Sequence, residues 1–305
     1  MATTTFQKYY QAPLPAIIAL LVVFGWQGVG HYVMYMMEHV WLKEHVFMAS
    51  FFLGLIGAVM VWVGGKRPEL SATLLGFAGG SLIWLAWIEF SFVYVADDLG
   101  VKPVVWGAKE TLPEYRVMLS SIGVLFASLL YFFSRRDTRC NMFMWMHRNF
   151  HLTPPGERTA VADRNISLLV AMETIYVTWF CYIVLLILYN PAFFGTDSPA
   201  TFIACGLFAI WAAYLGQRLW WYQRVAPAMR YAIPTAIIAY NVVEILEKWG
   251  KIAEIWVQPG KYAVQIGLAI AALVIVIALA IISPARRIVQ RPQDGDHGDA
   301  SPKGA

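Results

Sequence analysis

Charged residues are scarce in this chain of 305 residues. Asp, Glu, Lys and Arg together make up 14% of the sequence, whereas hydrophobic residues make up 59%. A soluble globular domain carries about 25% charged residues, so the composition excludes an ordinary soluble protein. The chain also contains 13 Trp and 15 Tyr, which is typical of a membrane protein with aromatic residues at both lipid–water interfaces.

Cysteines are few, and the motifs of nucleotide chemistry are missing. The three cysteines, Cys140, Cys181 and Cys205, form no CxxC pair, so we expect free thiols and no disulfide framework. The sequence has no Walker-type phosphate loop, no GxGxxG motif after a strand and no GxSxG elbow. We therefore expect neither a nucleotide nor a nucleic acid as partner, and any transport would be secondary.

Long apolar stretches dominate the chain. A transmembrane helix needs about 20 mostly apolar residues. Eight stretches qualify: 14–37, 46–65, 70–96, 116–134, 166–190, 200–222, 231–247 and 262–284. We therefore expect an all-α, polytopic integral membrane bundle of about eight transmembrane helices over residues 1–284, followed by a disordered cytoplasmic tail, 285–305. The seventh stretch contains Pro234, so a broken or re-entrant helix is an alternative there.

Arginines cluster in alternate loops and give an orientation. They concentrate in loop 135–165, in loop 223–230 and in the tail, which fall on one side if there are eight spans. Because cytoplasmic loops carry the excess of Lys and Arg, we expect both termini to be cytoplasmic. The expected location is a cell membrane, the cytoplasmic membrane of a bacterium, with lipid as the main partner.

Small residues predict close contacts in the third stretch. Gly76, Gly79 and Gly80 lie within four-residue spacing of one another. Small residues let the backbones of membrane helices approach closely, so we interpret these glycines as packing residues.

Histidines and a carboxylate gather at the end of the first stretch. His31 and Glu38 are seven residues apart and share a helix face at about 100° per residue. His39 and His45 follow at the outer level. Imidazole and carboxylate donors suit iron, zinc and copper, so we expect a metal site of His31, Glu38, His39 and His45. Copper or iron is the expected ion, and a haem remains an open alternative.

Further carboxyl groups lie near that same outer level. Glu89 lies in an aromatic part of the third stretch, and Asp97 and Asp98 lie at its exit. If a metal binds nearby, these three residues are the candidate catalytic groups, as ligands or as proton donors. The alternative is that the outer acids and histidines are interfacial residues in contact with water.

Two more glutamates suggest a proton relay. Glu173 lies a few residues inside the cytoplasmic end of the fifth stretch, and Glu244 lies at the outer end of the seventh. An ionisable residue within the membrane is a candidate functional site. The alternatives are a helix-to-helix hydrogen bond for Glu173 and a surface ion pair of Glu244 with Lys248.

The loop before the fifth stretch resembles a metal box. Cys140, His147 and His151 are donors at short spacing. Aromatic residues and arginines surround them, which favours a segment at the level of the lipid headgroups. Metal binding by the three donors is the alternative.

Three functional hypotheses follow. The first is a membrane oxidoreductase or oxygenase whose outward-facing metal acts on a small apolar or quinone-like substrate. The second is a proton- or cation-coupled secondary transporter. The third is a non-catalytic subunit or assembly factor of a membrane complex, with other subunits as partners.

Overall fold

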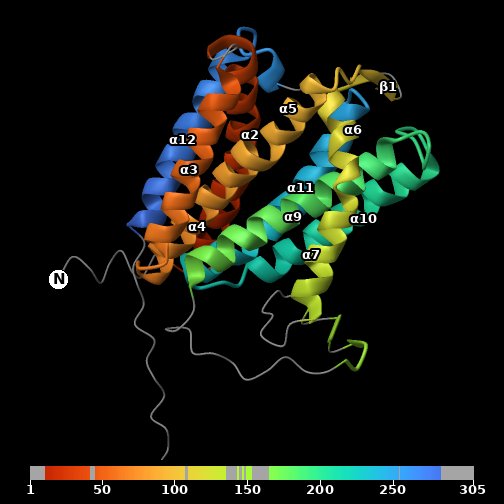
Figure 1. Ribbon diagram of the computed structural model, residues 1–305. Helices are drawn as coiled ribbons and strands as arrows, with labels where there is room; N and C mark the ends of the chain where they lie inside the picture. Colours follow the sequence, from red (N-terminus) through yellow and green to blue (C-terminus); the bar gives the residue numbers. More distant parts are fainter. Residues whose placement is uncertain are drawn as a thin grey trace, which may run out of the picture.

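Helices account for nearly all of the described chain (Figure 1). The structure is a computed structural model and describes residues 11–41, 45–106, 109–134, 143, 146–147, 149–152, 165–253 and 255–282. The elements are α2 (Leu14–Met36), η1 (Met37–Trp41), α3 (Val46–Gly64), α4 (Glu69–Ile83), η2 (Trp84–Glu89), α5 (Phe90–Asp98), β1 (Val104–Trp106), β2 (Lys109–Thr111), α6 (Pro113–Ser120), α7 (Ile122–Ser134), α9 (Ile166–Tyr189), α10 (Pro199–Leu219), α11 (Val225–Lys248), η4 (Ile255–Val257) and α12 (Ala263–Ile281).

Six segments of the described chain are long and apolar enough to cross a membrane. They are Leu14–Trp41, Val46–Gly64, Glu69–Asp98, Ile166–Tyr189, Pro199–Leu219 and Ala263–Ile281. The expectation of an all-α, multi-pass membrane bundle is confirmed at this level. The predicted tail, 285–305, lies outside the described residues.

The fourth predicted span is bent. Helices α6 and α7 meet at Ser121 with an angle of 45°, and together they would make a seventh span. Before them, β1 and β2 form a short antiparallel hairpin in which Val104 pairs with Thr111. The sequence predicted one span over 116–134, which contains no proline to mark a bend.

Helix α11 covers the seventh predicted stretch, 231–247. It is continuous for 24 residues and keeps Pro234 within it, so the alternative of a broken helix is wrong. At 1.5 Å per residue it is about 36 Å long. It is not among the six apolar segments, and it carries Arg230, Glu244, Glu247 and Lys248. It packs against α2, α9 and α10, and these neighbours shield its polar side chains.

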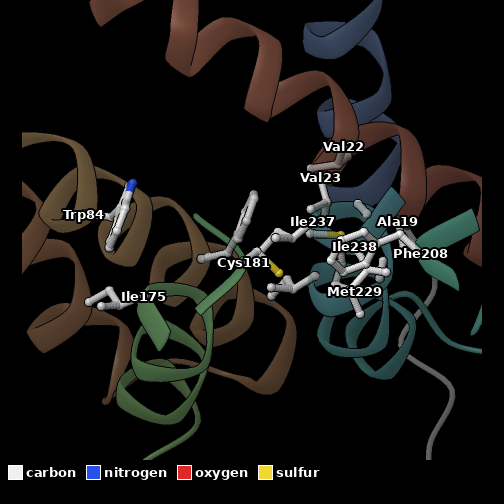
Figure 2. Packing of buried hydrophobic residues seen from close by; sticks show 14 of the residues in the cluster. Ala19, Val22, Val23, Trp84, Ile175, Cys181, Phe208, Met229, Ile237 and Ile238 are labelled. Atoms are coloured by element: carbon white, nitrogen blue, oxygen red, sulfur yellow. The ribbon is translucent and has the colours of Figure 1, made fainter. Parts of the chain in front are cut away.

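A continuous apolar core joins these helices. In Figure 2, Ala19, Val22 and Val23 of α2 lie near Ile237 and Ile238 of α11. Each of the five side chains is at most 4% exposed. At about 25 cal/mol per Å² of buried apolar surface, this contact fixes α11 against the N-terminal helix.

Glycines bring α3, α4 and α9 into close contact, as predicted. A Cβ atom on Gly79 would lie 2.6 Å from the carbonyl oxygen of Gly57. A Cβ on Gly76 would lie 2.4 Å from the oxygen of Ser167, and one on Gly80 would lie 2.7 Å from the Cα of Ala171. Because the atoms met are backbone atoms, the helices would have to separate to admit any side chain.

Candidate functional site: an acidic cluster at one end of the bundle

His31 is held between two aromatic rings and beside a carboxylate. Its ring stacks on Tyr240 of α11 and on Trp256 of η4, with centroid distances of 5.5 and 5.4 Å. Its Nε2 lies 3.5 Å from Oε1 of Glu244. Both side chains are about three-quarters buried (23% and 26% exposed). The loop after α11 therefore folds back onto α2 and fixes the imidazole against the carboxylate.

Glu89 lies at the end of a π-helical segment. The segment η2 interrupts the helix that runs from α4 to α5, and π-helical turns occur frequently at functional sites. The Glu89 side chain is 6% exposed, and the side chain of Trp84 lies beside its carboxyl group. The Glu89 carboxyl group is therefore buried at the end of this π-helical turn.

Glu38 and Glu114 bring two more carboxyl groups close to Glu89. The charges of Glu114, Glu38 and Glu244 all act on the Glu89 carboxyl. Glu38 also lies in a π-helical segment, η1. Glu114 lies in the first turn of α6 and is 6% exposed. We call His31, Glu38, Glu89, Glu114 and Glu244 the acidic cluster, and the end of the bundle that holds them the acidic end.

A small cavity adjoins this cluster, and we call it the polar cavity because amide, hydroxyl, imidazole and carboxyl side chains are among those that line it. Its volume is ≈20 Å³, which is room for about one water molecule. It lies between α2, α9 and α11 and is lined by Gln27, His31, Thr178, Cys181, Tyr182, Leu185, Ile237, Tyr240, Asn241 and Glu244.

Asn241 and Cys181 line this cavity, and their side chains would be suited to a bound water. Asn241 is 4% exposed, and its Nδ2 has no oxygen or nitrogen as hydrogen-bond partner within the described residues. The thiol of Cys181 beside it is only a weak acceptor. A buried amide without a full partner costs about 1–3 kcal/mol, so a water in the cavity would stabilise it.

Tyr182 lies between the two parts of the cluster, because the charges of both Glu89 and Glu244 act on it.

Other predicted site residues are exposed, and one of them, His39, acts by its charge on Glu114 of the cluster. His39 stacks on Tyr35 at 4.5 Å, and its side chain is 57% exposed. Its Nδ1 lies 3.9 Å from Oε2 of Glu38. His45 is exposed at the start of α3, and Asp97 and Asp98 are exposed at the end of α5.

The predicted metal donors do not converge. Over the parts of the chain that the structure describes, no three His, Cys, Asp or Glu side chains are grouped so that they could hold one ion. Among the described residues, His31 lies beside Glu244, whereas His39 lies beside Glu38. Two donors satisfy no more than half of the coordination of a tetrahedral or octahedral ion.

The opposite end of the bundle carries a second charged group. Glu69, at the start of α4, forms ion pairs with Arg224 and with Arg230, the latter at 2.8 Å. Arg230 also donates to the hydroxyl of Thr73 at 3.3 Å, and its charge acts on Glu173. We call this the arginine end. Glu173 therefore lies far from the acidic cluster, as the sequence indicated.

The sequence of the loop before α9 favours a segment at the lipid headgroups, with metal binding by Cys140, His147 and His151 as the alternative. Cys140 lies outside the described residues, and His151 is exposed. His147 is buried, and its Nε2 lies 2.8 Å from the carbonyl oxygen of Phe133. Its ring stacks on that of Phe133 at 4.6 Å. Within the described part of this loop, His147 packs against the end of α7.

Sequence reasoning missed four residues of the site: Glu114, Tyr182, Asn241 and Trp256. Asn241 offered a signal, since it lies three residues before Glu244 and thus on the same helix face. Glu114 offered little, because it follows a hairpin and precedes a bend. Its place beside Glu89 depends on the packing of α6 against α5.

Comparisons with known protein families, with curated proteins and with solved structures gave no match. The function is therefore inferred from the residues and their geometry.

Proposed function

We propose that this protein is a proton-coupled secondary transporter for a small cation, and that the acidic cluster is its proton-binding site. One observation carries the proposal: four carboxyl groups and one imidazole from five helical segments share one end of a bundle of membrane-spanning helices. Charged groups inside a membrane mark ion and proton pathways.

The chemistry of the cluster supports proton binding. Carboxylates whose charges act on one another in a medium of low dielectric repel one another unless some of them are protonated. Such a group of acids changes its charge by taking up or releasing a proton, which is what coupling to a proton gradient requires. The π-helical turns at Glu38 and Glu89 supply local irregularity where these side chains would have to move.

The proposed proton path would run along α11, from the arginine end to the acidic end. Arg230 and Glu244 are both on α11, 14 residues apart, or about 21 Å along the helix. Glu173 at the arginine end and the acidic cluster would be the two ends of the relay. A water in the polar cavity would connect the pair of His31 and Glu244 with Tyr182.

The proposed topology counts eight crossings. It includes the bent pair α6–α7 and the shielded helix α11 with the six apolar segments. Both termini and the arginine end would then be cytoplasmic, in agreement with the positive-inside rule. We place the protein in the cytoplasmic membrane of a bacterium, with the acidic end outward.

Flux in proteoliposomes tests the proposal. The protein is reconstituted with a pH-sensitive dye inside the vesicles, and a panel of sodium, potassium and organic ammonium salts is added outside. We expect proton movement that depends on the added cation and falls about tenfold or more in Glu89→Gln. Asp197→Asn is the matched control, because Asp197 is an exposed carboxylate in the turn before α10. Equal proton movement in Glu89→Gln and the control would refute the proposal.

The hypothesis of a metal oxidoreductase stays a prediction with less support. It would need donors beyond the two contacts of His31 and His39. Metal analysis and an optical spectrum of the purified protein test it: about one equivalent of iron or copper, lost in His31→Ala, would favour it. Subunits that co-purify with the chain would favour the third hypothesis.

A further inference from the structure

A larger cavity opens at the acidic end, between α3, α5 and α6. Its volume is ≈230 Å³, which is smaller than the roughly 300–1,000 Å³ of sites for drug-sized ligands. Its described walls include Phe47, Val93, Asp97, Val101, Pro113 and Glu114. It is separate from the polar cavity, with which it shares no lining residue. We call it the outer cavity.

The outer cavity combines two carboxyl groups with apolar walls. Glu114 is 6% exposed and lies inside, whereas Asp97 is exposed at the end of α5. The amide of Glu114 itself lies beside this carboxyl group, and the charges of Glu38 and His39 act on it, although His39 does not line the cavity. The described lining contains no Lys, Arg or His. A buried carboxylate that faces a cavity without a cationic side chain is suited to a cationic ligand.

The side chains that line the outer cavity suit an organic ammonium ion better than a metal ion. Calcium takes about six to eight oxygen ligands and magnesium about six, and two carboxyl groups among aliphatic side chains do not supply them. Phe47 and the aliphatic residues instead offer an aromatic ring and apolar surface. These bind the methyl or methylene groups of an ammonium ion, by cation–π attraction and by burial of apolar area.

We infer that the outer cavity binds a small organic ammonium ion, the substrate of the transporter proposed above, on which this inference rests. Glu114 is the counter-ion inside the cavity, Asp97 attracts the cation at its mouth, and Phe47 contacts its alkyl groups.

Glu114 belongs both to the outer cavity and to the acidic cluster, and this gives a coupling mechanism. Its charge acts on Glu89, and that of Glu38 acts on both. A bound ammonium ion adds one positive charge beside Glu114, and one proton leaves the cluster in exchange. The charge of the site is unchanged by the exchange, and no bond other than the O–H bond of a carboxyl group is broken.

Binding to the full chain in detergent tests the inference. Tetramethylammonium chloride is titrated calorimetrically in two buffers with different ionisation enthalpies, so that proton release is measured together with affinity. tert-Butanol is the uncharged probe of similar size. We expect tetramethylammonium to bind with release of a proton, and tert-butanol to bind much more weakly.

Two variants and one control locate the site. Glu114→Gln should weaken binding about tenfold or more, and Phe47→Leu about fivefold through loss of the aromatic ring. Asp197→Asn should leave affinity unchanged. If Glu114→Gln fails to fold, as size-exclusion chromatography would reveal, Phe47→Leu still decides the matter.

The outcomes separate the two proposals. No binding of tetramethylammonium, or equal affinity for tert-butanol, overturns the outer cavity as an ammonium site. Cation-dependent proton flux that needs Glu89 would leave the transporter standing in that case. Conversely, binding that is weakened by Glu114→Gln, without proton-coupled flux of any cation, supports the ammonium site and overturns the transporter.

Discussion

Replacing Gly79 by alanine should separate two helices that now touch through their backbones. The new Cβ would lie 2.6 Å from the oxygen of Gly57 and 2.8 Å from Cγ2 of Val61. Both distances are well inside van der Waals contact, and the nearer atom belongs to a backbone that cannot rotate away. Helices α3 and α4 must therefore move apart, which loosens their packing along the whole contact.

The expected change in the free energy of unfolding is obtained by comparing Gly79 with a second glycine, Gly206. Overpacking of a close contact costs about 1–3 kcal/mol. Alanine also has a higher helix propensity than glycine, by about 1 kcal/mol. Gly206 in α10 faces open space, since a Cβ added there would meet no atom within 4 Å, and its alanine variant would show the propensity gain alone. The two variants should therefore differ in free energy of unfolding by about 1–3 kcal/mol, with Gly79→Ala the less stable.

Reversible unfolding in mixed micelles with increasing SDS measures this difference, with helix content followed by circular dichroism. Gly57→Ala is a further check, because its Cβ would lie 2.8 Å from the oxygen of Gly79. Equal stabilities of Gly79→Ala and Gly206→Ala would refute the close contact of α3 with α4.

Three further variants test other contacts. Arg230→Met removes one of the ion pairs of Glu69 and should lower the free energy of unfolding by about 1–2 kcal/mol in the same SDS titration; an unchanged midpoint would contradict this. Thr201→Val removes the buried hydroxyl that donates to the oxygen of Gly195 at 2.8 Å and should lower it by about 1–3 kcal/mol; a stability equal to that of the parent would show that the bond contributes nothing. His31→Phe keeps a ring between two aromatic neighbours but loses the imidazole, so the fold should persist while proton-coupled flux is lost; retained flux would remove His31 from the proposed relay.

Much of the bundle could be predicted from the sequence, because lipid selects long apolar helices by a simple rule. Helices α3, α9 and α12 begin and end within a few residues of the predicted stretches. The bend between α6 and α7 could not be predicted. It depends on how the preceding hairpin directs α6 against α5, which is a tertiary contact.

The candidate site was predicted only in part, for a related reason. His31, Glu38, Glu89 and Glu244 share the acidic end, as helix direction alone indicated. Spacing along one helix could not show that the partner of His31 is a carboxylate on α11. It also suggested four metal ligands, of which His45 and His39 are exposed.

Infrared spectroscopy of the purified protein tests the central claim most directly. Protonated carboxyl groups absorb through their C=O stretch apart from carboxylates, so a pH titration reports how many acids in the bundle gain and lose protons. The acidic cluster predicts a pH-dependent carboxyl band that is lost in Glu89→Gln and kept in Asp197→Asn. A band that is unchanged in Glu89→Gln would contradict proton binding at this cluster.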